Sequence, residues 1–104
     1  MWRTYMDKIK NLKISLSENV FLNMGALGDN LELSKSGCGK YTLRLTRNNI
    51  SELILAYKDH LKSAHCEMVN NGTSKMTETC FPIKGTRVEN GWIILDLKEG
   101  FLCV

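Results

Sequence analysis

The sequence predicts an α+β fold in which an antiparallel sheet of about 6–8 short strands carries one amphipathic helix. Several short segments alternate apolar and polar residues, which is the period of a strand with one buried face. From Ile50 to Ala64 the apolar residues recur instead at every third or fourth position, which is the period of a helix. An Asn90-Gly91 pair between two alternating segments predicts a hairpin near the end of the chain.

Four strands are expected before the helix. The alternating segments place them, in order, at residues 12–17, 20–24, 31–34 and 41–45. Glycine, asparagine and aspartate residues, which favour turns, separate these segments. In the fourth segment, Leu43 and Leu45 are expected to face the core, and Thr42 and Arg44 are expected to face water.

One helix is expected over residues 49–66, packed on the sheet. Asn48 or Asn49 is expected to start the helix. Asn49 and Glu52 have the spacing of a capping box, in which each side chain satisfies a backbone amide of the first turn. The apolar positions beyond the cap form a single stripe, made of Ile50, Leu53, Ile54, Tyr57, Leu61 and Ala64. Such a stripe is stable only when it is buried, so the helix is expected to pack on the sheet. With the four strands before it, the order of elements is ββββα.

A β-hairpin is expected after the helix. Strand patterns occupy residues 77–83, 86–89, 92–97 and 101–104. Asn90-Gly91 predicts a type I′ turn between the second and third of these segments. Pro82 lacks a backbone donor, so its strand is expected at a sheet edge or to end early. No repeat or linker interrupts residues 1–104, which predicts a single compact domain.

The composition favours a cytoplasmic protein, or one of the host cytoplasm if the chain is viral. No apolar stretch reaches the roughly 18 residues that cross a membrane, and charged residues interrupt positions 1–16 where a signal peptide would need an apolar core. The same compartment favours reduced thiols over disulfides at the four cysteines, Cys38, Cys66, Cys80 and Cys103.

Motifs that would indicate an enzyme are incomplete. Gly39-Lys40 resembles the end of a phosphate-binding loop, but Ser34 stands where that motif needs its first glycine, and a strand follows instead of a helix. His60 and His65 are five residues apart and would face different sides of a helix. No cysteine or histidine pair has the spacing of a closed zinc site. We therefore expect no catalytic activity, no metal and no cofactor.

Basic residues predict one class of partner. The net charge of +3 is concentrated in the first 47 residues. Lysine and arginine contact phosphates, and an aromatic side chain stacks on bases, as in proteins that bind single strands. The residues expected to bind a partner or nucleic acid are Lys13, Lys35, Lys40, Arg44, Arg47 and Phe21.

The order ββββα and the segment TLRLTRNNISELILAY resemble the single-stranded-DNA-binding coactivator and Whirly-type domains over about half of the chain. That resemblance implies binding of single-stranded nucleic acid on a sheet face. A small chain rich in lysine and asparagine also resembles phage or viral accessory proteins that block a host factor.

Protein contact is the main function expected from the sequence. Trp2, Tyr5 and Phe101 have no clear core position, and an exposed edge strand is expected. Aromatic anchors and edge pairing are two common ways of binding another protein. We therefore expect a non-catalytic protein that inhibits or regulates a macromolecular partner by protein–protein contact. Single-stranded nucleic-acid binding through the basic sheet face is the alternative, and the oligomeric state is left open.

Overall fold

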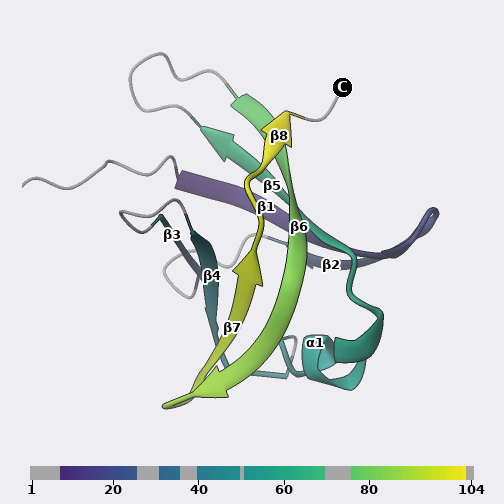
Figure 1. The fold of residues 1–104 in the computed structure, drawn as a ribbon, viewed down its shortest axis with the longest axis vertical. Helices are drawn as coiled ribbons and strands as arrows, with labels where there is room; N and C mark the ends of the chain where they lie inside the picture. The colour runs from purple at the N-terminus through teal and green to yellow at the C-terminus, as the bar shows by residue number, and fades with distance from the viewer. Residues whose placement is uncertain (1–7, 26–30, 36–39, 50, 70–75, 103–104) are drawn as a thin grey trace, which may run out of the picture.

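The computed structural model describes residues 8–25, 31–35, 40–49, 51–69 and 76–102. Within them the chain forms eight strands, one short α-helix and one 3₁₀ turn (Figure 1). In order these are β1 (Lys8–Ser17), β2 (Val20–Gly25), β3 (Leu31–Lys35), β4 (Tyr41–Thr46), α1 (Glu52–Ala56), η2 (Lys58–His60), β5 (Ser63–Val69), β6 (Met76–Glu89), β7 (Trp92–Leu97) and β8 (Phe101–Leu102).

All strand pairs are antiparallel and follow the order β2-β1-β5-β6-β7-β4-β3, with β8 added beside β6. The 14-residue strand β6 belongs to both parts of this sheet, because its first part pairs with β5 and its last part pairs with β7. Figure 1 shows β6 as one long curved strand. We name the two parts by their strands: the β1 half holds β2, β1, β5, β8 and residues 76–82, and the β4 half holds residues 83–89, β7, β4 and β3.

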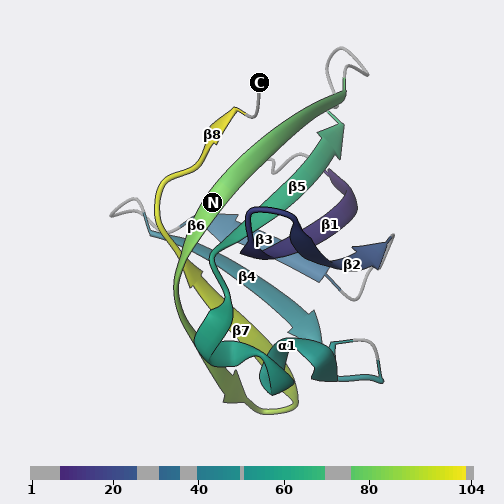
Figure 2. The same ribbon diagram turned by 90° about the vertical axis from the view of Figure 1, so that its right-hand side faces the viewer.

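The core lies between the two halves. Leu12 of β1, Leu43 of β4 and Ile93 of β7 belong to one cluster and are completely buried. Ile54 of α1 joins the same cluster, so the helix closes one end of the core (Figure 2). Burial of apolar surface from both halves is what holds the curved sheet in this shape.

The expected strands are largely confirmed. The first four lie where the alternation placed them, although β1 begins earlier, at Lys8. Leu43 and Leu45 face the core and Arg44 faces outward. The hairpin between β6 and β7 turns at Asn90 and Gly91, whose φ angles of 50° and 83° are the positive values that a type I′ turn requires.

The helix expected over residues 49–66 is wrong in its length. α1 has only five residues, and residues 63–69 form β5, a strand between β1 and β6. Ala64, Cys66 and Met68 are buried at every second position, which is strand periodicity. Pairing on both sides satisfies the backbone of β5, and this non-local gain outweighs the local helical pattern. The fold is therefore dominated by its sheet, and the α+β description holds only loosely.

The start of the helix differs from the expected capping box by one residue. Asn48 Oδ1 accepts a hydrogen bond from the Ser51 amide (2.9 Å), and Ser51 Oγ accepts one from the Asn48 amide (2.8 Å). Ser51 Oγ also donates to the Thr46 carbonyl (2.8 Å) and is completely buried. Glu52, which was expected to reach back to Asn49, is instead paired with Arg47.

Pro82 neither ends its strand nor lies in an edge strand, which corrects the expectation. It lies where β6 exchanges its partner β5 for β7, so its missing N–H interrupts neither ladder. Its carbonyl accepts a hydrogen bond from the Lys98 amide (2.9 Å). Immediately after it, Ile83 pairs with Leu97 and Gly85 pairs with Asp96, which leaves Lys84 as the extra residue of a β-bulge.

The described residues include only some of the cysteines and none of the N-terminal aromatic residues. In the described residues, Cys66 and Cys80 are buried thiols that form no disulfide. Cys38, Cys103 and the N-terminal aromatic residues Trp2 and Tyr5 lie outside the described residues. None of the helices described is both long and apolar enough to cross a membrane.

The contrast between a core leucine and a surface leucine tests this fold. Leu43→Ala should lower the free energy of unfolding by about 2–5 kcal/mol, because a completely buried side chain leaves a cavity. Leu53→Ala on α1 is the matched control. That side chain is 45% exposed, so its loss should change the free energy by less than about 0.5 kcal/mol. Urea denaturation followed by circular dichroism measures both, and equal losses would contradict the placement of α1.

Candidate functional site

The outer face of the β4 half carries a stacked arginine. Thr46 pairs with Trp92 and Arg44 pairs with Ile94, so Arg44 and Trp92 lie diagonally on neighbouring strands. The Arg44 guanidinium lies 4.3 Å from the centroid of the Trp92 ring, within the range of a cation–π interaction. Arg44 Nη1 also donates to Glu32 Oε1 on β3 (3.0 Å). The aromatic face and the cation are thus held together on an exposed sheet surface.

A second arginine lies across β7 from the first. Arg44 and Arg87 are the two partners of Ile94, which is buried although it faces outward. The aliphatic stems of flanking arginines can shield such a residue from water. The outer face of β7 can therefore hold an apolar residue, Ile94, although the helix does not cover that face.

Arg87 is held by carboxylates. Its Nε donates to Asp96 Oδ2 (3.1 Å) and its Nη2 donates to Asp96 Oδ1 (3.3 Å), which is a bidentate pair. Arg87 also pairs with Glu89 on its own strand. The hydrogen bonds to Asp96 are the largest cause of a raised pKa for the Arg87 guanidinium. These contacts hold the Arg87 guanidinium in one orientation over β7.

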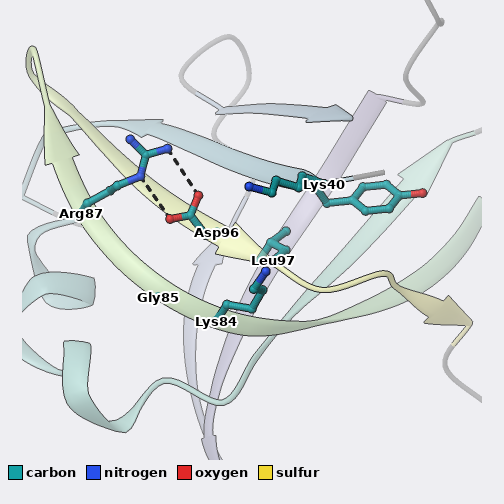
Figure 3. Close-up of a pocket in the computed structure, with 7 residues that line it drawn as sticks. Lys40, Lys84, Gly85, Arg87, Asp96 and Leu97 are labelled. Carbon is teal, nitrogen blue, oxygen red and sulfur yellow. Dashed lines mark hydrogen bonds and ion pairs between the residues drawn. The ribbon is translucent and has the colours of Figure 1, made fainter. Parts of the chain in front are cut away.

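Beside this pair lies a pocket of about 380 Å³, which we call the Lys84 pocket (Figure 3). It is lined by Lys40, Tyr41, Lys84, Gly85, Arg87, Asp96 and Leu97. Figure 3 shows the side chains of Lys40, Lys84 and Arg87 around the Asp96 carboxylate. Three cationic side chains and one carboxylate therefore border this hollow.

The outer face of the β1 half carries aromatic side chains beside polar ones such as Lys13 and Glu67. The Phe21 ring meets the His65 ring edge-on, with 5.5 Å between centroids. His65 Nε2 lies 3.1 Å from Ser63 Oγ and 3.9 Å from Cys80 Sγ. Cys80 pairs with Phe101 of β8. We call Phe21, His65, Cys80 and Phe101 the aromatic row.

The end of the aromatic row is open to solvent. Phe101 is 57% exposed and Leu102 is 65% exposed, unusually high fractions for large apolar side chains. Among the described strands, β8 pairs only with β6, so its other edge presents backbone N–H and C=O groups. Phe21 at the other end is 45% exposed.

The predicted site residues fall into three places: the β1 half, the β4 half with Lys40 just before it, and Arg47 in the chain entering α1. Lys13 and Phe21 lie on the outer face of the β1 half, where Lys13 pairs with His65 and with Asn23. Lys35, Lys40 and Arg44 belong to the β4 half. The Lys35 ammonium lies 5.4 Å from the Tyr41 ring centroid, and Lys40 lies next to Tyr41 in the pocket. β5, β6 and β7 separate Lys13 from Arg44, so the basic residues do not share one patch.

Arg47 has a structural partner. Its Nε and Nη2 donate to the two carboxylate oxygens of Glu52, at 2.6 and 3.0 Å. This hydrogen bonding is the largest cause of a lowered pKa for Glu52 and a raised pKa for Arg47. Arg47 therefore helps to hold the chain entering α1.

The pattern of the sequence did not identify Lys84, Arg87 or Trp92 as site residues. The sequence did contain one signal for the position of Arg87. A two-residue type I′ turn at 90–91 sets the register of the hairpin. That register pairs Arg87 with Ile94 and so puts Arg87 beside Asp96. The position of Lys84 depends on the bulge, which has no signature in the local sequence.

Metal and thiol chemistry find little support in the described geometry. Within those ranges, no three or more His, Cys, Asp and Glu side chains group to hold a metal ion. The Cys80 thiol approaches His65 but is only 7% exposed, so a substrate has little access to its sulfur.

No family model matches this sequence, and no curated protein or solved structure matches it either.

The Arg47–Glu52 pair predicts a pH dependence. Because the folded pKa of Glu52 is below its ordinary value of 4.5, the pair stabilises the fold above that value. This contribution is lost as the pH falls through the folded pKa. Glu52→Gln should therefore lose less thermal stability than the parent between about pH 6 and pH 3.

Thermal melts at the two pH values measure this difference. Glu18→Gln is the control, because Glu18 is an exposed carboxylate in the β1–β2 turn with no ion pair among the described residues. Its acid-induced loss should equal that of the parent. A Glu52→Gln variant with the same acid-induced loss as the parent would show that the pair contributes nothing.

Proposed function

We propose that this protein is a non-catalytic binding protein of the cytoplasm, or of the host cytoplasm if viral, that inhibits or regulates a macromolecular partner by protein–protein contact. The observation that supports it is the exposure of Phe101 and Leu102 on the open edge of β8. Large apolar side chains in such a position cost free energy in water and gain it when a partner covers them.

Two recognition modes meet at this edge. An extended segment of a partner can add to β8 through its backbone N–H and C=O groups. Phe101 can enter a pocket of that partner as an aromatic anchor, the kind of residue that dominates interface energies. Phe21, at the far end of the aromatic row, widens the apolar surface across the β1 half.

The contacts around His65 support a binding role over a catalytic one. Its ring is in contact with Phe21, Ser63 and Cys80, and Cys80, itself part of the row, is buried. A catalytic nucleophile has to reach its substrate, whereas a side chain that supports an aromatic surface does not.

Substituting the exposed aromatic residue tests the proposed interface. Phe101→Ala should reduce the recovery of a specific co-purifying protein by at least about tenfold, because truncating a hot-spot aromatic costs roughly 2 kcal/mol or more. Affinity purification from native cell extract, quantified by mass spectrometry, measures recovery. Leu53→Ala, which removes a similarly exposed apolar side chain on α1, should leave recovery unchanged. The proposal fails if the parent enriches no protein, or if Phe101→Ala recovers it fully.

The Arg44–Trp92 stack favours a second candidate, a single-stranded nucleic-acid-binding protein. A cation held over an aromatic ring offers a phosphate contact beside a stacking platform. Against this, Glu32 already neutralises part of the Arg44 charge, and Asp96 and Glu89 do the same for Arg87. Protein contact is therefore the better-supported function.

Salt-dependent binding tests the second candidate. Arg44→Ala should weaken binding of a fluorescent single-stranded oligonucleotide and lower the dependence of log K on log salt by about one, because one phosphate contact is lost. Lys13→Ala should do the same only if the strand also crosses the β1 half. Lys62→Ala, an exposed lysine before β5, is the control. Fluorescence anisotropy that detects no binding at low salt removes this function.

A further inference from the structure

The β-bulge of β6 redirects one lysine. In a regular strand, Ile83, Lys84 and Gly85 would alternate between the two faces. Here Ile83 and Gly85 pair with the consecutive residues Leu97 and Asp96, so the register shifts and Lys84 has no partner opposite it. The shift brings Lys84, Gly85 and Arg87 to the wall of the same pocket. Bulges that redirect a side chain are concentrated near functional sites.

Gly85 leaves the floor of this pocket open. It pairs with Asp96, and no atom lies within 4 Å of the Cβ that another residue would have there. The Asp96 carboxylate is turned toward Arg87, which binds both of its oxygens. The space beside the pair therefore remains as a hollow of about 380 Å³, wide enough for a small molecule.

The charges around the hollow favour an anion. Lys40, Lys84 and Arg87 line it with one carboxylate, Asp96, and Glu89 also pairs with Arg87. Lys84 forms no ion pair with any described residue. Cations gathered on both sides of a cleft raise the local concentration of anions. Lysine binds phosphate as a mobile point charge. Arg87 is held by Asp96 and Glu89 and forms a fixed wall of the hollow.

We propose that the Lys84 pocket binds a phosphate group, either free phosphate or the phosphate of a monoester, beside Lys84 and Lys40. Free phosphate and a phosphate monoester each carry up to about two negative charges at neutral pH, which suits a hollow bordered by lysine side chains. A phosphodiester carries only one charge.

This site is separate from the proposed protein interface. The pocket lies on the β4 half, whereas Phe101 and the aromatic row lie on the β1 half. Loss of partner binding in Phe101→Ala therefore says nothing against the pocket. An absence of phosphate binding likewise says nothing against the protein interface. The two proposals can be judged independently.

Amide chemical shifts measured at constant ionic strength test the proposal directly, with adenosine 5′-monophosphate as the probe. The probe should shift the amide signals of Lys84, Gly85 and Arg87, and inorganic phosphate should shift the same signals. Tighter binding of the probe would assign the pocket to a monoester, and equal binding would assign it to free phosphate. Adenosine, which lacks the phosphate, should leave these signals unchanged. Binding should weaken below about pH 6, where the monoester takes up a proton.

Variants distinguish a built site from general charge. Lys84→Ala should weaken binding about tenfold, which is typical for a lost charge-assisted hydrogen bond, and Lys84→Arg should retain most of it. Lys58→Ala, an exposed lysine in η2, should bind as the parent does.

Three results would overturn the proposal. The first is an absence of shifts at the pocket at millimolar probe. The second is an equal loss of binding in Lys84→Ala and Lys58→Ala, which would indicate nonspecific attraction. The third is tighter, Lys84-dependent binding of a single-stranded oligonucleotide without a terminal phosphate, which would assign the pocket to a nucleic-acid backbone. Circular dichroism of each variant confirms that a lost signal reflects binding and not unfolding.

Discussion

The change of partner along β6 is the constraint on which the rest of the structure depends. One strand pairs with β5 over its first part and with β7 over its last part, so it joins two halves whose apolar faces meet. Pro82 and the bulge after it lie at this change of partner. A residue without an N–H is tolerated there, because neither ladder requires that donor.

The same bend gives the protein two different outer surfaces. The β1 half presents the aromatic row, which ends in the exposed Phe101, beside polar residues such as Lys13 and Glu67. The β4 half presents arginines engaged with Trp92 and with carboxylates, next to a cationic hollow. Since β5, β6 and β7 lie between Lys13 and Arg44, one flat basic face across the whole sheet does not form.

The region between α1 and β5 shows how local and non-local preferences compete. Leu61 and Ala64 fit a helical stripe, but Ala64, Cys66 and Met68 also fit a strand with one buried face. The strand forms because β1 and β6 offer hydrogen-bond partners on both sides, along with a core for the buried side chains. α1 then ends at Ala56, and only Ile54 of its residues is completely buried.

The sequence by itself determined the features that rest on local chemistry. These are the early strands, the outward position of Arg44, and the hairpin at Asn90-Gly91, where two adjacent residues adopt positive φ. Phe101 was also identified as an aromatic residue outside the core. Only the tertiary structure decided that residues 63–69 form a strand, that Pro82 lies at a bend, and that Lys84 comes close to Lys40. These depend on pairings between distant segments, whose free energy is absent from any local pattern.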